Sequence, residues 1–404
     1  LIKTKAVPQG DGSYKITGQK IWISGGEQDL TENIIHLVLA RIEGGPEGIK
    51  GISLFVVPKY IVNEDGSLGE RNACSCGGLE EKMGIHGNAT CVMNYDGATG
   101  WLVGEEHKGM RTMFVMMNEA RLGVGLQGLA QAEVAYQNAV DYAKDRVQGR
   151  SLNGAKAPEK VADPIIVHPD VRRMLLDQKA FIEGARAFAY WTAFQGDLQH
   201  KSNDEKVQER AGDYMALLTP VVKAYLTHKG CESANLGLQV HGGSGFTREW
   251  GMEQFVRDSR ITMIYEGSNG GRAVFSFFAE LDDFLGTAGD DAELQPFVEG
   301  LTTVKGQLQE GTNWLMQNGM SDFNNAGASS HDYLHLFGLT ALCFMWARMA
   351  KVAIEKKADG DPFYGEKLMT GQYFLDRMLP DAAAHLAKVK TGAKSMMALS
   401  ADQF

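Results

Sequence analysis

The stretch from residue 239 to residue 269 holds the closest grouping of residue types that could carry out chemistry. Its glycine-rich run at residues 242–245 predicts a turn whose backbone N–H groups can approach a ligand, and phosphate is the natural candidate. Arg257 and Arg260 follow and could supply positive charge. Glu266 stands among apolar residues, where a partly desolvated carboxylate takes up a proton more readily and can act as a base. On the residues alone, the alternative that Glu266 faces solvent in a capping turn stays open.

Two other parts of the chain place aromatic, hydroxyl or basic side chains on predicted elements. A strand is predicted over residues 18–24, and it carries Trp22 and Ser24; the alternative is an ordinary strand with a buried Trp22. A long helix is predicted from about residue 108 to residue 148, because apolar residues recur there at spacings of three and four. Arg121 and Arg146 lie on this helix, and the alternative for each arginine is a solvated helix face.

Taken in order, these segments resemble motifs of the acyl-CoA dehydrogenase family. The run at 239–269 resembles its C-terminal signature, a glycine-rich turn followed by Tyr-Glu-Gly-Thr, and the run at 18–24 resembles Gly-x-Lys-x-Trp-Ile-Thr. Residues 81–87 resemble Glu-x-Lys-x-Gly-x-Arg-Gly, with His86 in place of the usual Arg, and we interpret this histidine as structural. Residues 145–148 resemble Arg-x-Gln-Phe-Gly without the Phe.

Within the family, the chain is most similar to a long bacterial subgroup that includes 3-methylmercaptopropionyl-CoA dehydrogenase. The segments that carry this similarity are residues 29–41, 51–59 and 62–69. The chain starts with Leu1 and enters strand-like sequence directly, so we expect that the family's N-terminal helical domain is missing here.

The resemblance implies a role for each site residue. Glu266 would be the base that removes the α-proton, since the position used by some relatives is Ala120 here. The residues implied for substrate binding are Arg121, Tyr265, Glu266 and Gly267. The residues implied for FAD binding are Trp22, Ser24, Arg146, Gln239, Gly242, Gly243 and Ser268. Arg146 and Gln239 would serve the FAD of a neighbouring subunit, which implies a homodimer or homotetramer.

The elements that must position these residues fall into an α+β order. Residues 1–104 are rich in β-branched runs bracketed by Gly and Pro, and they predict a partial middle β-barrel-like domain. Residues 105–280 predict an α-helical bundle domain, and residues 281–404 an additional C-terminal helical domain. Gly123, Gly125 and Gly128 interrupt the long helix, so we expect close packing of that helix against another.

Composition narrows the classes of partner. The net charge is −10, which argues against nucleic acid, because phosphate backbones need a basic face. No apolar run approaches the ~20 residues of a membrane span, so we expect no integral membrane protein. The five cysteines are odd in number and scattered, which favours a reducing compartment, and Cys74-x-Cys76 has no second pair, so no metal site is predicted.

The predicted function is FAD-dependent α,β-dehydrogenation of an acyl-CoA thioester, with 3-methylmercaptopropionyl-CoA or a short- or medium-chain acyl-CoA as substrate. The resemblance implies an electron-transferring flavoprotein as acceptor. One alternative is an acyl-CoA oxidase that passes electrons to O2, and another is a catalytically silent flavin-fold protein that acts in assembly or binding. The expected location is the bacterial cytoplasm, with the mitochondrial matrix left open.

Overall fold

The computed structural model describes residues 2–265 and 274–404, and its chain divides into two compact units, Leu1–Ala120 and Arg121–Phe404. The predicted residues Glu266, Gly267 and Ser268 lie outside the described residues.

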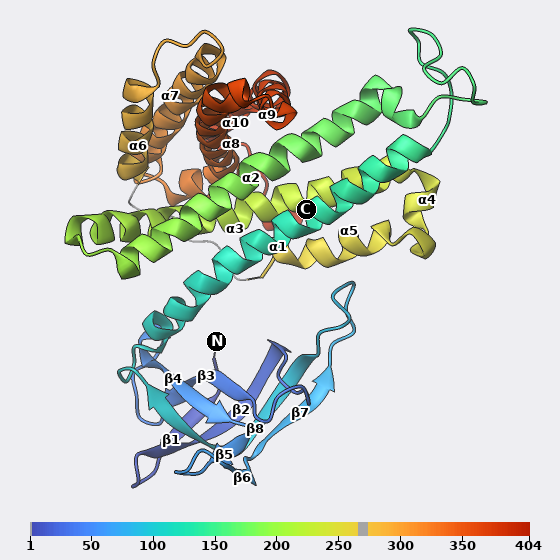
Figure 1. Cartoon of the computed structure of the whole chain (residues 1–404). Coiled ribbons are helices and arrows are strands. Elements are labelled where there is room, and N and C mark those ends of the chain that lie inside the picture. Colours follow the sequence, from blue (N-terminus) through green and yellow to red (C-terminus); the bar gives the residue numbers. More distant parts are fainter. Residues whose placement is uncertain (1, 266–273) are drawn as a thin grey trace. The chain divides into compact units, whose positions relative to one another are not determined.

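The first unit is a β structure that closes on itself. Its strands are β1 (Lys5–Pro8), β2 (Ser13–Ser24), β3 (Ile35–Ile42), β4 (Ile52–Pro58), β5 (Tyr60–Val62), β6 (Leu68–Arg71), β7 (Cys74–Leu79) and β8 (Thr90–Val103). The main sheet runs β2-β1-β3-β4-β8-β7, and β2 also pairs with β8, so β2, β1, β3, β4 and β8 form a ring. The ring confirms the predicted barrel-like character, and Figure 1 shows these strands wrapped around one another.

Alternation along the strands builds the core of this unit. In β3 every second residue is buried, namely His36, Val38, Ala40 and Ile42, as the two-residue repeat of a half-buried strand requires. Val38, Ala40 and Ile42 join Ile16, Phe55 and Met93 from other strands in one apolar cluster. Next to this cluster, the Nδ1 atom of His36 lies 2.7 Å from the hydroxyl of Tyr95.

The second unit is helical. Its helices are α2 (Pro169–Lys201), α3 (Glu205–His241), α4 (Gly243–Phe246), α5 (Met252–Arg260), α6 (Val274–Thr287), α7 (Gln295–Asn318), α8 (Phe323–Lys356), α9 (Pro362–Tyr373) and α10 (Asp381–Thr391). The long helix α1 (Gly109–Asp145) begins in the first unit and supplies its remaining residues to this one. In Figure 1, α1, α2 and α3 run as long neighbouring rods.

The predicted close helix packing is confirmed for two of the three glycines of α1. A Cβ on Gly125 would lie 2.8 Å from Val222 of α3, and one on Gly128 would lie 2.7 Å from the carbonyl oxygen of Leu226. Both glycines therefore let α1 and α3 approach to backbone contact. Gly123 was wrongly included, because a Cβ there would meet nothing within 4 Å.

A large apolar core joins most of the helices of the second unit. It contains residues of α1, α2 and α3 together with residues of α6, α7, α8 and α10. Trp346 of α8 is fully buried, and its indole Nε1 donates a hydrogen bond of 3.2 Å to the carbonyl of Ala180 on α2. The segment Phe323–Asp359 is long and apolar enough to cross a membrane, but 72% of its most apolar window is buried in this core.

Candidate functional site

Trp22 is presented outward by an irregularity in β2. Lys20 pairs with Met93 and Ile23 pairs with Cys91, so β2 contains one more residue than β8 over this step. This is a β-bulge, and within it Trp22 adopts φ 61° with 71% of its surface exposed. The alternative of an ordinary strand with a buried Trp22 is therefore wrong. A non-glycine residue at positive φ costs roughly 1–2 kcal/mol, and such strain gathers at ligand sites.

Ser24 is the last residue of β2, and it lies next to a loop that Lys82 holds in place. It pairs with Thr90 of β8, and its side chain is exposed. The ammonium group of Lys82 donates to the hydroxyl of Thr90 at 2.8 Å and to the carbonyls of Ile85 and Asn88 at 2.9 and 2.6 Å. The motif at residues 81–87 thus braces the loop next to Ser24.

The predicted glycine turn connects two helices of the second unit. Helix α3 ends at His241, and Gly242 takes φ 60° before α4 begins. A Cβ on Gly242 or Gly243 would meet nothing within 4 Å, and both glycines and Gln239 are exposed. Positive φ explains the glycine at 242, and the open space at Gly242 and Gly243 lets a ligand approach the backbone there.

An aromatic cluster fixes this turn against the end of α1. The ring of Tyr142 stacks on His241 with a centroid distance of 4.3 Å and meets Trp250 edge-on at 5.2 Å. Burial lowers the pKa of His241, and its Nδ1 lies 2.9 Å from the carbonyl oxygen of Gly237. Sequence reasoning missed Tyr142, because its partners lie about a hundred residues away.

Arg146 lies one turn beyond Tyr142. Its backbone N–H donates to the carbonyl of Tyr142 at 2.8 Å, and its side chain is exposed. The structure thus brings Arg146 and the glycine turn to the same end of the helical unit, with Tyr142 and His241 between them. A guanidinium and exposed backbone N–H groups suit an anionic ligand. Of the two arginines that the sequence suggested for this role, Arg257 is already paired with Glu253.

Arg121 lies on α1, and Tyr265 contacts the same helix. Arg121 is only 3% exposed, so the solvated-face alternative is wrong for this arginine. The hydroxyl of Tyr265 donates a hydrogen bond to the side-chain oxygen of Gln127, six residues along α1 from Arg121. The residue that precedes Glu266 in the chain is thereby held on α1. Gln127 was not predicted, and no local sequence signal marks it.

Known protein families match two parts of the chain. Residues 107–271 match the domain described as "Acyl-CoA dehydrogenase, C-terminal domain", and residues 277–400 match "Acetyl-CoA dehydrogenase C-terminal like". The chain is 40% identical to 3-methylmercaptopropionyl-CoA dehydrogenase of Ruegeria pomeroyi, over 99% of this chain and 70% of that protein. It is 35% identical to the broad-specificity linear acyl-CoA dehydrogenase FadE5 of Mycobacterium tuberculosis, over 100% of this chain and 71% of that protein.

Solved structures share the fold. An acyl-CoA dehydrogenase from Bacillus anthracis complexed with FAD superimposes with a TM-score of 0.73 at 21% identity, over 96% of this chain and 65% of that one. ACDH-11 of Caenorhabditis elegans in complex with C11-CoA gives a TM-score of 0.74 at 21% identity, over 93% of this chain and 61% of that one. With two family domains and two long relatives above 30% identity, the chain belongs to the acyl-CoA dehydrogenase family, within the long bacterial subgroup.

Proposed function

We propose that this chain carries out FAD-dependent α,β-dehydrogenation of an acyl-CoA thioester to the 2-enoyl-CoA. The observation that carries the proposal is Trp22, which the barrel holds outward at positive φ on the strand that the family resemblance assigns to the flavin. An exposed indole held at an energetic cost suits contact with a ligand better than packing within the first unit.

The residues present suit FAD. Trp22 would cover the flavin ring, and Ser24 would donate or accept a hydrogen bond near it. Arg146, Gln239, Gly242 and Gly243 would hold the phosphate-bearing part of a neighbouring subunit's FAD, with Ser268 near the adenosine. FAD, when bound, supplies the acceptor for the hydride that leaves the β-carbon.

The chain's own residues would handle the proton and the thioester. Glu266 would take the α-proton, and its backbone N–H would donate to the thioester carbonyl oxygen as negative charge builds there. Tyr265, anchored to Gln127 of α1, would fix the position of this segment. Arg121 and Gly267 would border the acyl-CoA. Holding the base and the hydride acceptor on opposite sides of the Cα–Cβ bond supplies the orientation that the step needs.

The relatives guide the choice of substrate and acceptor. One is named for 3-methylmercaptopropionyl-CoA and another for linear acyl-CoA, so short- and medium-chain thioesters are the first to test. We propose an electron-transferring flavoprotein as acceptor. The oxidase and silent-protein alternatives find no support in these names, and oxygen consumption during turnover would reveal an oxidase. Both relatives are bacterial and support a cytoplasmic location, and nothing favours the mitochondrial matrix.

Substitution of the base tests the proposal. Glu266→Gln keeps the size and the backbone N–H but removes the basic oxygen, so acyl-CoA should still bind. The rate of flavin bleaching on anaerobic mixing with acyl-CoA should fall by about 10²–10⁴-fold. Glu249→Gln, at an exposed position on the same part of the chain, is the matched control and should bleach at the wild-type rate. Near wild-type bleaching in Glu266→Gln would overturn the assignment.

Assembly provides a second check. If Arg146 and Gln239 serve a neighbour's FAD, the FAD-loaded protein should be a dimer or tetramer. Phe246 and Trp250, next to the glycine turn, are 81% and 48% exposed, and a neighbouring subunit would cover such apolar surface. Light scattering on the FAD-loaded protein measures the mass, and a monomer that binds FAD tightly would contradict this proposal.

A further inference from the structure

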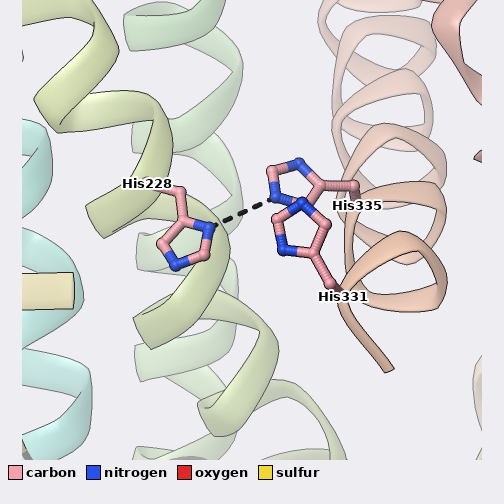
Figure 2. A group of neighbouring side chains, drawn as sticks. All are labelled: His228, His331 and His335. Atoms are coloured by element: carbon pink, nitrogen blue, oxygen red, sulfur yellow. Dashed lines mark hydrogen bonds between the residues drawn. The ribbon is translucent and has the colours of Figure 1, made fainter. Parts of the chain in front are cut away.

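Three histidines from two helices converge in the second unit, apart from the residues assigned to the flavin. His331 and His335 lie four residues apart on α8, so they occupy the same face of that helix. His228 of α3 faces them, and Figure 2 shows the three rings turned toward one another. One nitrogen of each ring can be chosen so that all three lie within 4.8 Å of one another.

The spacing of two of these nitrogens fits a shared metal ion. Nδ1 of His228 lies 3.2 Å from Nε2 of His335. Two nitrogens bound to one tetrahedral Zn²⁺, each about 2.0–2.1 Å from the metal, lie roughly 3.3 Å apart. The pair therefore already has the separation of two ligands on one ion. His331 is exposed, so a change of rotamer can bring its nitrogen the remaining distance without disturbing the core.

The contact between His228 and His335 also has an ordinary explanation without a metal. The hydrogen bond between them uses one N–H and one lone pair, so without a metal they form an ordinary satisfied pair.

The surroundings supply groups of the kind found around metal ligands. The ring of His385 stacks on His335 at a centroid distance of 5.2 Å, and its Nδ1 lies 2.8 Å from a carboxylate oxygen of Asp332. Asp332 thus holds a ring that stacks on one of the three histidines. The ammonium group of Lys229, next to His228 in the chain, is paired with Glu232 at 2.6 Å, so an opposite charge offsets its repulsion of a cation.

We propose that His228, His331 and His335 form a binding site for a divalent transition metal ion of the zinc class, which would clamp α3 to α8. Imidazole is the ligand that zinc, copper and nickel share, and three protein nitrogens leave a fourth position for solvent. The clamp would join the helix that ends in the glycine turn to the additional C-terminal helices. This site is independent of the dehydrogenase assignment.

Zinc binding to the whole 404-residue chain, loaded with FAD, tests the proposal. Purified protein freed of metal with a chelator is titrated with ZnCl2 in a calorimeter, and bound zinc is counted by mass spectrometry after gel filtration. The wild type should bind one equivalent and unfold at a higher temperature with zinc, an effect that EDTA reverses. Loss of an outer-shell partner typically weakens metal binding about 10–100-fold, so loss of a direct ligand in His331→Ala or His228→Ala should weaken it at least as much.

The controls separate this site from others. His331 is exposed, so His331→Ala should fold normally and give an interpretable result even where a change at buried His335 does not. His200→Ala, at an exposed histidine outside the cluster, should bind zinc as the wild type does. The proposal is overturned if the wild type binds no zinc. Equal affinity and stoichiometry in His331→Ala, His228→Ala and wild type would mean an adventitious ion only and would also overturn it.

Discussion

Replacing Trp22 by glycine should separate stability from flavin binding. The indole is 71% exposed, so its loss removes little packing, and glycine relieves a positive φ that costs roughly 1–2 kcal/mol. Glycine also adds about 0.5–1 kcal/mol of unfolded-state entropy. These effects nearly cancel, so the apoprotein should stay within about 1 kcal/mol of wild type. A buried tryptophan would instead cost about 3–5 kcal/mol.

The effect on FAD affinity should be much larger. A tryptophan offers up to ~250 Å² of surface, so an exposed fraction of 71% corresponds to roughly 180 Å². If a flavin covers half of that, burial contributes about 2 kcal/mol at ~25 cal/mol per Å², and ring stacking adds about 0.5–1.5 kcal/mol. The dissociation constant for FAD should therefore rise roughly 70–400-fold. Quenching of flavin fluorescence on titration of the apoprotein measures it.

Ile85→Gly is the matched control. Ile85 also adopts positive φ, 47°, in the β unit, but no flavin role is assigned to it. This variant should relieve the same kind of strain and leave FAD affinity within a few-fold of wild type. The reasoning fails if Trp22→Gly binds FAD as tightly as the wild type does, or if it loses 3 kcal/mol or more of stability.

Two further predictions concern the scaffold. Gly128→Ala places a Cβ against the α3 backbone and should lower the free energy of unfolding by about 1–3 kcal/mol. Gly123→Ala, on the same helix but facing open space, should raise it by up to about 1 kcal/mol. Thermal unfolding measures both variants, and shifts in the same direction would contradict the packing argument. Burial lowers the pKa of His36, so neutral His36 contributes fully to the free energy of unfolding above pH ~6.5. Below that pH the unfolded chain takes up the proton first, and the free energy of unfolding falls by at most about 1.4 kcal/mol per pH unit. His36→Gln should flatten the acid side of a melting-temperature profile, and an unchanged slope would refute this.

Local pattern was enough to predict several elements. The β-branched runs near residues 34–41 and 52–58 became β3 and β4, and the apolar spacing from residue 108 onward became α1. In each case the signal lies within the element itself, as a repeat of two or of 3.6 residues. The glycines of α1 added a tertiary inference, because a glycine inside a helix lowers stability unless another backbone needs the space.

Features set by distant partners could not be read from the sequence. The exposure of Trp22 comes from a bulge that exists only because β2 pairs with β8, some seventy residues later. A glycine inside a helix can mark a break, yet α3 runs unbroken through Gly230, because Gly230 faces Gly128 of α1. Helix α6 runs through two acidic residues to Thr287, since Phe277 and Leu281 of this helix are buried in the common core.

The histidine cluster shows the same limit for chemistry. His331 and His335 have the spacing of two ligands on one helix face, but an i, i+4 pair alone does not indicate a site. The third ring comes from α3, more than a hundred residues earlier, so only the packing of α8 against α3 creates the cluster.

Helix α3 links the additional C-terminal helices to the candidate active site. Its middle contacts α8, where the ring of Tyr225 fills the space left by Gly338, and His228 meets His335 one turn later. Its last turn carries Gln239 and leads into the glycine turn. A rigid helix transmits the position of its middle to its end, so the C-terminal helices would fix where the turn is presented. The extra segment would then have a physical role in the proposed site.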